Sequence, residues 1–447
     1  MNLKTPVVAL ALMLAATASA STTAFVNVNI VPMTSETVIE TQTVIVTDGV
    51  ITSISNFGST AVPDEAEIID GTDRYLMPGL VEMHGHVPGG DSTSLERILS
   101  LYVANGITTV RGMLGQPSHI DLRTRIANGE TLGPSLITSG PSFNGRSVDS
   151  PETGRDMVRA QHAAGYDFLK IHPGLTHEEF DAIAETANEV GIPFAGHVPE
   201  DVGVERALAM GIATIDHLDG YMQTLLPPND DPSGGLSGFF GVFIADQADE
   251  EKIADIARAT AAAGVWNVPT DSLFVHVTSP ELGTEDLAHR PEMKFMPAST
   301  VAQWEDYKTA LLNDANYDAD TAARAIQLRR QLILALHEAG AGLLLGSDSP
   351  QVFNVPGFAL HHELRLIVEA GLSPFAAIQT GTINAARFFG AEDRWGTVRE
   401  GLVADLILLD SNPLTDVTNS KRIHGVMLRG QWLSRADLDA TLERFQR

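Results

Sequence analysis

The middle of the chain alternates short apolar runs with polar, helix-forming stretches. Eight such runs follow one another, and most are followed by a loop and a helical stretch. They are Leu80 to His84, Ile107 to Met113, Ser135 to Gly140, Asp167 to Ile171, Pro193 to His197, Ala213 to Leu218, Val265 to Thr270 and Leu343 to Asp348. Strands that alternate with helices are typical of parallel sheets, and a closed barrel of this kind needs eight of them. The pattern predicts an α/β fold with a (β/α)₈ TIM barrel.

One of the intervening helices carries clear boundary signals. Thr176 and Glu179 have the spacing of a capping box, in which each side chain satisfies a backbone N–H group of the other residue. Gly191 and Pro193 are typical of a helix end. We therefore expect a helix that opens after Thr176 and runs to about Val190.

Both ends of the chain have β-strand character. Near the N-terminus, the β-branched runs 43–47 and 49–54 are divided by Asp48 and Gly49, which is a hairpin signal. Near the C-terminus, the apolar runs 404–409 and 424–428 are divided by a turn-rich segment. We expect residues 21–75 and 395–447 to form one composite β-sandwich domain, and residues 76–394 to form the barrel.

An insert from Pro227 to Gly241 interrupts the alternation after the sixth run. It is rich in Asp, Pro, Gly and Ser, which are typical of loops. Long loops in compact domains often act as active-site lids, but a solvated surface excursion explains the composition equally well. The role of this insert is left open.

The first 20 residues have the features of a signal peptide. Lys4 precedes an apolar run from Pro6 to about Ala16, and Ala18 and Ala20 form an A-x-A cleavage signal. We expect cleavage near Ala20 and export, either to the periplasm or out of the cell. The run is shorter than the roughly 20 residues that span a bilayer, so we expect no stable membrane anchor.

Composition narrows the partners and the chemistry. The 447 residues include 29 Lys and Arg against 57 Asp and Glu, a net charge of −28 that argues against nucleic acid as a partner. We expect a small-molecule substrate, and a homo-oligomer is left open. The chain has no cysteine, which excludes disulfides and thiolate ligands. Any metal ion must be held by His, by carboxylates or by a modified Lys.

Residues that can bind metal ions recur at the ends of the predicted strands. His84 and His86 lie two apart, so in a strand they face the same side and can hold one cation. A single pair of this kind is weak evidence, because buried or surface histidines also explain it. However, Lys170, His197, His217 and Asp348 end the fourth, fifth, sixth and eighth runs. The C-terminal ends of barrel strands converge on one rim, which is where barrel enzymes place their active sites.

Lys170 is an unusual residue at the end of a core strand, because a buried ammonium group without a partner is costly. It could pair with a carboxylate below the site. Alternatively, its amine could react with carbon dioxide to give a carbamate, an anion able to bridge two metal ions.

The combination resembles the amidohydrolase superfamily, in its imidazolonepropionase-like and prolidase-like branch. The resemblance lies in segments 76–86, 196–199, 216–218, 346–348 and 396–410, together with Lys170. It implies two divalent metal ions, for which zinc is the default choice with His and carboxylate ligands. It further implies that His84, His86 and Asp348 hold the more buried ion, that His197 and His217 hold the more exposed one, and that a carbamate on Lys170 bridges the two.

The resemblance also implies a reaction. A metal-bridging hydroxide would attack a carbonyl group, and Asp348 would act as general base and then protonate the leaving nitrogen. The expected substrate has an amide-like C–N bond, as in an N-acyl amino acid, a dipeptide or a cyclic amide. The same centre would serve an esterase, a lactonase or a phosphotriesterase. A deaminase is disfavoured by the bridging lysine, and a periplasmic binding protein without catalysis leaves the ordered ligands unexplained.

Four further residues are candidates for contacts with the substrate. Tyr221 could donate a hydrogen bond to the developing oxyanion, or could simply pack under the loop. Arg146 could bind a substrate carboxylate, or be an ordinary surface arginine. His172 should share the face of Lys170 and line the mouth of the pocket. His361, or its neighbour His362, could reach the substrate or cap a helix.

Overall fold

A computed structural model describes residues 21–89, 92–227 and 237–447 of the chain, and these residues form a mixed α/β fold. The predicted signal peptide and the centre of the predicted insert, residues 228–236, lie outside the described residues. Within the described ranges, every helix is too short or too polar to cross a membrane.

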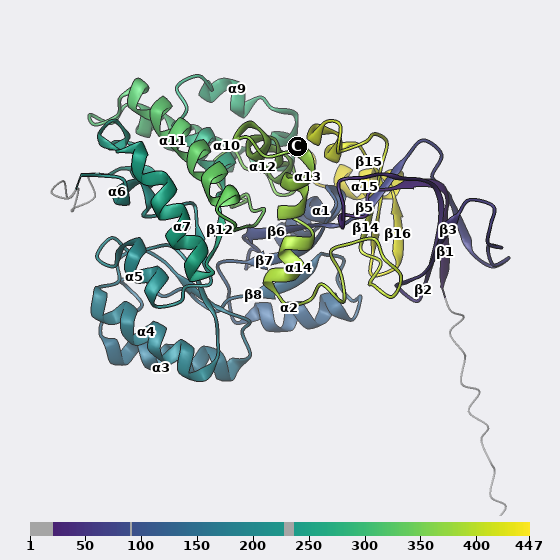
Figure 1. Ribbon diagram of the computed structural model, residues 1–447, viewed down its shortest axis with the longest axis horizontal. Coiled ribbons are helices and arrows are strands. Elements are labelled where there is room, and N and C mark those ends of the chain that lie inside the picture. The colour runs from purple at the N-terminus through teal and green to yellow at the C-terminus, as the bar shows by residue number, and fades with distance from the viewer. Residues whose placement is uncertain (1–20, 90–91, 228–236) are drawn as a thin grey trace, which may run out of the picture.

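The two ends of the chain combine into one eight-stranded sheet (Figure 1, right-hand side). Its strands are β1 (Thr22–Ile30), β2 (Ile39–Thr47), β3 (Val50–Asn56), β4 (Glu67–Asp70), β5 (Tyr75–Pro78), β14 (Leu406–Leu409), β15 (Ile423–Leu428) and β16 (Gln431–Ser434). The order is β16-β15-β14-β5-β1-β2-β3, and β4 pairs with β1. The antiparallel pair β5 and β14 joins the two ends, with Leu76 opposite Leu408. The composite arrangement was predicted, but the strands belong to a single sheet rather than to two separate ones.

The predicted hairpin near the N-terminus is formed by β2 and β3. The turn residues Asp48 and Gly49 both have positive φ angles, of 51° and 79°. Such angles suit the tight turns that match the twist of antiparallel strands. A side chain on Gly49 would also meet the carbonyl oxygen of Arg429 at 3.0 Å, so this turn packs closely against the C-terminal part of the sheet.

Each of the eight predicted runs contains or overlaps a parallel strand. These are β6 (Leu80–Gly85), β7 (Ile107–Gly112), β8 (Ser135–Thr138), β9 (Leu169–Ile171), β10 (Phe194–Gly196), β11 (Thr214–Asp216), β12 (Trp266–Val268) and β13 (Gly342–Leu343). They form a three-stranded sheet, β6-β7-β8, and a five-stranded sheet, β13-β12-β11-β10-β9. Isolated parallel bridges link Ser139 with Phe168 and Gly85 with Ser349, one at each junction between the two sheets.

Helices surround these parallel strands (Figure 1, left and centre). They are α1 (Ser92–Ala104), α2 (Ser118–Ala127), α3 (Pro151–Ala164), α4 (His177–Val190), α5 (Gly203–Ala209), α6 (Tyr221–Thr224), α7 (Ile253–Ala263), α8 (Asp271–Thr278), α9 (Thr284–Ala288), α10 (Ala298–Leu312), α11 (Ala319–Glu338), α12 (Phe358–Glu369), α13 (Pro374–Thr380) and α14 (Ile383–Phe388), while α15 (Arg435–Glu443) follows the last strand of the large sheet. The predicted capping box of α4 is present between Thr176 and Glu179, and the helix ends at Gly191.

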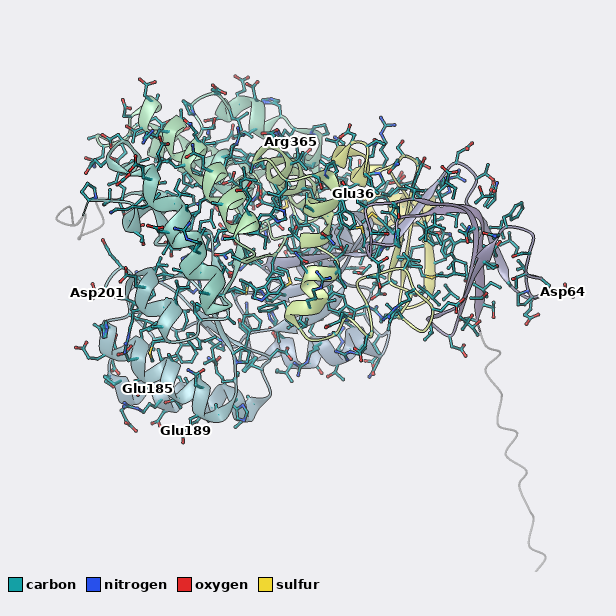
Figure 2. All side chains as sticks on the ribbon, viewed as in Figure 1. Glu36, Asp64, Glu185, Glu189, Asp201 and Arg365 are labelled. Atoms are coloured by element: carbon teal, nitrogen blue, oxygen red, sulfur yellow. The ribbon has the colours of Figure 1, made fainter. Side chains whose placement is uncertain are left out.

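The acidic excess of the chain lies partly on these outer helices. Figure 2 shows the labelled Glu185 and Glu189 of α4, and Asp201 near α5, at the periphery of the molecule, and all three are exposed. Exposed carboxylates keep their hydration, so they add charge at the surface without a desolvation cost.

Candidate metal centre

Three of the predicted metal ligands meet in one compact cluster. His84 and His86 lie at the C-terminal end of β6, and Asp348 lies in the segment that follows β13. One ligand atom from each residue lies within 4.8 Å of the other two. The Oδ1 atom of Asp348 is 2.6 Å from Nε2 of His86 and 3.6 Å from Nε2 of His84. His84 and Asp348 are buried and His86 is half-buried, so this cluster forms the floor of the site.

The backbone around Asp348 is held in an uncommon conformation. Asp348 has a φ angle of 58°, in the left-handed region that non-glycine residues rarely occupy. Its N–H group donates to the carbonyl oxygen of His84 at 2.8 Å. Below it, the carboxyl group of Glu82 accepts hydrogen bonds from the backbone N–H groups of His84 (3.0 Å) and Ser347 (2.8 Å). Burial raises the pKa of Glu82 to about 8. A left-handed backbone conformation like that of Asp348 persists only where the surrounding structure fixes the residue, and such conformations cluster at active sites.

His197 and His217 form a second pair at the ends of β10 and β11. Their ring centres are 4.6 Å apart, and that of His217 is 4.4 Å from the ring of His84. The Nδ1 atom of His197 lies 2.9 Å from a carboxylate oxygen of Asp219, and that of His217 lies 2.9 Å from the hydroxyl of Thr270. These hydrogen bonds occupy Nδ1 of both rings and leave Nε2 of each as the atom that could bind a metal ion.

Lys170 lies on β9, beside the strand β10 that leads to His197, and its amine is unsatisfied. The side chain is fully buried, and Nζ makes no hydrogen bond within the described residues. The carboxylate of Asp216 lies 4.0 Å away, at the limit of an ion pair, but it already accepts hydrogen bonds from Arg111 (3.1 Å) and Thr214 (2.7 Å). Burial lowers the pKa of Lys170 to about 8. The carboxylate below the site therefore exists, but it is engaged by Arg111 and Thr214, and its second oxygen lies 2.9 Å from Nδ1 of His84.

The histidines are electrostatically suited to bind cations. Burial lowers the pKa of both His84 and His217 well below the ordinary value of histidine. Burial, reinforced by the charge of Lys170, lowers the pKa of His172 to about 2. These rings are therefore neutral, as metal ligands must be. Neutral imidazoles, a carboxylate and an orphaned buried amine together fit a centre for divalent metal ions.

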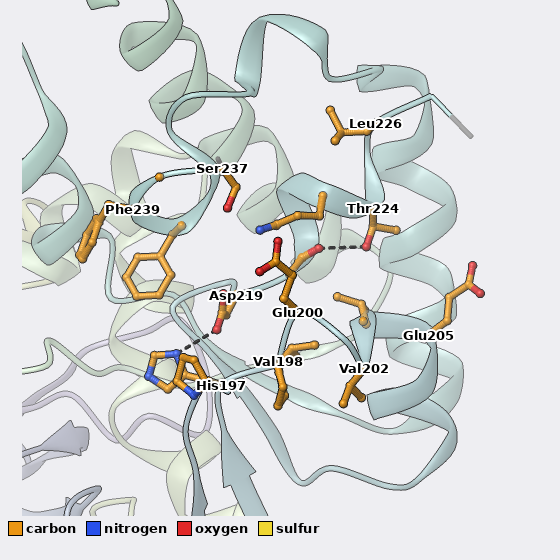
Figure 3. Close-up of a pocket in the computed structure, with 18 of the residues that line it drawn as sticks. His197, Val198, Glu200, Val202, Glu205, Asp219, Thr224, Leu226, Ser237 and Phe239 are labelled. Atoms are coloured by element: carbon orange, nitrogen blue, oxygen red, sulfur yellow. Dashed lines mark hydrogen bonds and ion pairs between the residues drawn. The ribbon is translucent and has the colours of Figure 1, made fainter. Parts of the chain in front are cut away.

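A cavity of about 840 Å³ opens beside the second pair of histidines (Figure 3). His197 forms part of its floor with Asp219, and the carboxylate of Glu200 points into it. The ring of Phe240 also lines the cavity and stacks on that of His217, with centres 4.9 Å apart. The volume is typical of pockets that bind small molecules. The His197–His217 half of the centre therefore faces a space large enough for a substrate.

Two of the predicted substrate contacts lie together in a second recess of about 400 Å³. Arg146 and His172 both line it, and the ring of His172 lies 5.0 Å from that of His197. The loop that carries Arg146 is tied to the end of β9, because Phe143 exchanges backbone hydrogen bonds of 2.8 Å with Lys170 and His172. The structure thus places both residues beside the candidate centre.

Tyr221 and His361 are directed elsewhere, which corrects two predictions. The buried hydroxyl of Tyr221 donates to the side-chain oxygen of Asn267 at 2.8 Å and lies 3.0 Å from the hydroxyl of Thr260, so it is committed to β12 and α7. The buried ring of His361 bonds to Ser420 (2.9 Å) and to the carbonyl oxygen of Asn105 (3.1 Å). Both residues therefore support packing between elements rather than contacts with a substrate.

Several residues that support the ligands were not predicted. They are Glu82, Arg111, Asp216, Asp219, Thr270 and Asn354, and most lie within three residues of a strand end. Glu82 gave a usable signal, because an acidic residue inside a core strand is unusual. Asp216, at the end of β11, could have been suspected for the same reason. Arg111 lies in β7, whereas Asp219, Thr270 and Asn354 lie outside the strands and helices, and the proximity of these four to the ligands is visible only in the fold.

The family model of the amidohydrolase family matches residues 75–433, so this chain belongs to the amidohydrolase family. This confirms the superfamily that the sequence resembles. Among curated relatives, an adenine deaminase of Ruegeria sp. is 24% identical over 407 residues, which cover 88% of this chain and 54% of that protein. Adenine deaminase 2 of Desulfotalea psychrophila is 41% identical over 93 residues, or 20% of this chain and 16% of that protein. The ochratoxinase of Aspergillus niger is 23% identical over 377 residues, which cover 76% of this chain and 71% of that protein. The chain thus spans at most about half the length of these two deaminases.

Solved structures share the fold over nearly the whole chain. Bottromycin amidohydrolase matches with a TM-score of 0.70 and 23% identity, covering 95% of this chain and 90% of that one. A putative prolidase from Bifidobacterium longum matches with a TM-score of 0.68 and 24% identity, covering 95% and 99%. At these identities the likeness establishes the fold, and the activity has to be argued from the site.

Proposed function

We propose that this chain is a metal-dependent hydrolase that cleaves an amide-like C–N bond. The observation that carries the proposal is the orphaned amine of Lys170, buried 4.0 Å from the carboxylate of Asp216, which in turn lies 2.9 Å from Nδ1 of His84 in the His84–His86–Asp348 cluster. Membership of the amidohydrolase family supports a metal-dependent hydrolase. Its likeness to proteins named as an adenine deaminase, a putative prolidase and an amidohydrolase supports a C–N bond as the target.

In this proposal His84, His86 and Asp348 hold one divalent cation, and His197 and His217 hold a second. Lys170, converted to its carbamate by reaction with carbon dioxide, would replace an unsatisfied buried amine with an anion that can bind a cation. When bound, such cations supply Lewis acidity for a carbonyl oxygen and lower the pKa of a water molecule to near neutrality. Zinc suits these ligands, although the donor set alone does not select it over other divalent ions.

The residues of the chain then divide the remaining work. Asp348 accepts the proton of the attacking water and delivers it to the leaving nitrogen, a role that its place next to both histidines of the buried cluster allows. Asp219 and Thr270 fix the orientation of the His197 and His217 rings. Phe240 covers the face of His217 and keeps water away from it.

The two recesses near His197, which share Pro173 in their walls, suggest a substrate with two unlike parts. Arg146 has an exposed guanidinium beside His172, which suits a substrate carboxylate. The larger cavity has room for a bulky group on the other side of the scissile bond. N-acyl amino acids and dipeptides have this form. Esters, lactones and phosphotriesters remain alternatives on the same centre.

We extend the proposal to the architecture and the location of the chain. The two parallel sheets would close into a (β/α)₈ barrel through the bridges at Ser139 and Gly85. The β-rich ends, residues 21–75 and 395–447, would form one accessory domain. Export after cleavage near Ala20 would deliver the enzyme to the periplasm or beyond it.

The decisive experiment is a substrate panel with the purified, metal-loaded chain. The panel contains N-acyl amino acids, dipeptides, lactams, esters and a phosphotriester, and it includes adenine because of the adenine deaminase relatives. We expect turnover of the carboxylate-bearing amides, and about two metal ions per chain by elemental analysis. Deamination of adenine, together with one metal ion per chain, would show that the chain is a deaminase and that the proposed function is wrong. Metal binding without any turnover would favour a binding protein.

A further inference from the structure

A chain of buried polar groups runs from Arg290 to the residue before Asp348. Arg290 follows α9, and its Nη1 atom lies 2.7 Å from Nε2 of His276 on α8. The Nδ1 atom of the same ring lies 2.8 Å from the side-chain oxygen of Asn354. The amide nitrogen of Asn354 then donates to the carbonyl oxygen of Ser347. His276, Asn354 and Ser347 are buried.

The chemistry of Arg290 fixes the direction of every hydrogen bond in this chain. A guanidinium group can only donate, so Nε2 of His276 must accept. Burial and the positive charge of Arg290 hold the pKa of His276 well below its ordinary value, so the ring is neutral and carries its proton on Nδ1. That proton is donated to the oxygen of Asn354, which turns the amide NH₂ group toward Ser347. The guanidinium of Arg290 thus sets the tautomer of His276, and that tautomer sets the orientation of the Asn354 amide.

The chain ends on the peptide unit that sets the position of Asp348. The carbonyl of this unit, from Ser347, accepts from Asn354, and its N–H group, from Asp348, donates to the carbonyl of His84. A peptide unit is planar, so fixing both ends fixes its orientation. That orientation determines where the side chain of Asp348 points, and Asp348 itself has a left-handed φ angle of 58°.

We propose that Arg290, His276 and Asn354 are positioning residues that place the carboxylate of Asp348 at the metal centre. The inference rests on the proposed function, because it assigns these residues to a metal-bound Asp348. They act through the Ser347–Asp348 peptide and not by contact with the substrate. Lys308 also helps to hold His276 in place, because its ammonium group donates to the backbone carbonyls of His276 (2.8 Å) and Ser279 (2.9 Å).

The test compares Arg290→Met, which removes the donor, with Arg290→Lys, which keeps a cationic donor. Arg365→Met is the matched control. Arg365 is another arginine nearby, but it pairs with the exposed Glu369 and takes no part in the hydrogen bonds that link Arg290 to Ser347. Metal-depleted full-length protein is titrated with Co²⁺, whose visible absorption reports the ligand geometry. Steady-state kinetics are measured at saturating metal.

Removal of a residue that orients a metal ligand typically costs about 10- to 100-fold in metal affinity or activity. For Arg290→Met we expect a loss of that size in Co²⁺ affinity and in kcat, a changed Co²⁺ spectrum and an unchanged KM. Arg290→Lys should recover most of the loss, and Arg365→Met should match the unsubstituted chain. Asn354→Asp, which sets a carboxylate oxygen against the carbonyl of Ser347, should reproduce the Arg290→Met spectrum.

Two results would overturn the inference. One is an Arg290→Met variant with unchanged Co²⁺ affinity, spectrum and kcat. The other is an equal loss of thermal stability in the Met and Lys variants with an unaltered spectrum, since that pattern indicates a purely structural role. If the unsubstituted chain binds no Co²⁺ at all, the proposed function fails instead, so the two failures can be told apart.

Discussion

The two halves of the candidate centre are built in different ways. The buried half, His84, His86 and Asp348, brings its ligand atoms within 4.8 Å of one another, and the backbone around it is fixed by Glu82 and Asn354. The open half, His197 and His217, is named for the large cavity that His197 borders, although the ring of His217 is itself buried, and each of its rings has one side-chain hydrogen bond. The backbone of the buried half is therefore held by two acidic or amide side chains, whereas that of the open half is held by Arg329, which donates to the carbonyl oxygen of His217 at 2.7 Å.

A metal centre built in this way can be both stable and accessible. Rigid ligands lose little entropy on binding an ion, so the buried half should hold its cation tightly. The open half lacks a carboxylate ligand of its own, since Asp219 is bonded to Nδ1 of His197. It should depend on the anion that a carbamate at Lys170 would supply. Each of the following substitutions tests this asymmetry, and they are ordered by the size of the expected effect.

The largest effect should come from Asp348→Asn in the buried half. The substitution removes the proposed general base and an anionic ligand together, while the amide keeps nearly the same shape. We expect kcat to fall by about 10³-fold or more, since general acid–base catalysis alone contributes about 10²- to 10⁴-fold. Circular dichroism should remain unchanged. Near-normal kcat in a sample free of contaminating enzyme would remove Asp348 from the mechanism.

Lys170→Met tests whether the open half depends on the bridging group. The methionine fits a fully buried position and cannot form a carbamate. Metal content should fall from about two ions per chain to about one, with the buried half still occupied, and kcat should fall by about 10²-fold or more. The unsubstituted chain, depleted of carbon dioxide and metal, should regain activity faster when bicarbonate accompanies the metal. The variant should not respond to bicarbonate. Two tightly bound ions in the variant would contradict the carbamate.

Asp219→Asn should affect the open half alone. Asp219 accepts the hydrogen bond from Nδ1 of His197, which increases the basicity of the ring and fixes its orientation. We expect about 10- to 100-fold weaker binding of the second cation, and unchanged binding of the first. Stepwise titration of the metal-depleted protein with Zn²⁺, followed by calorimetry, separates the two events. Equal weakening of both steps would show that the halves are not independent.

Much of this architecture could be predicted from the sequence, because the patterns that indicate strands and helices are local. Each of the eight predicted runs contains or overlaps a parallel strand, since apolar periodicity directly reports burial. The predicted runs overshoot at their ends, however. The run 213–218 yields a strand of only three residues, because His217 and Leu218 adopt positive φ angles and leave the ladder. The chain departs from regular structure where the candidate metal ligands begin.

The site was less predictable where contacts connect distant segments. Spacing placed His84 and His86 on one face, and the ends of parallel strands brought them near Asp348. By contrast, nothing in the spacing of Arg290, His276 and Asn354 indicates that they form one chain. The choice between His361 and His362 could not be made either, since adjacent residues on a helix point in different directions. His361 bonds to Ser420 and His362 approaches Arg290.

The smallest effect should come from Tyr221→Phe, which tests whether the open half contains an oxyanion donor. Tyr221 follows His217 by four residues, and from the sequence it is a candidate for such a donor. Its hydroxyl is instead shared between Asn267 and Thr260. The substitution should leave kcat/KM within about twofold, and should lower the free energy of unfolding by about 1 kcal/mol, the usual net value of one hydrogen bond. Urea denaturation measures the second quantity. A loss of kcat of about 10²-fold, the usual cost of removing an oxyanion donor, would mean that the tyrosine turns toward the substrate during turnover. The open half would then rearrange on binding while the buried half stays fixed.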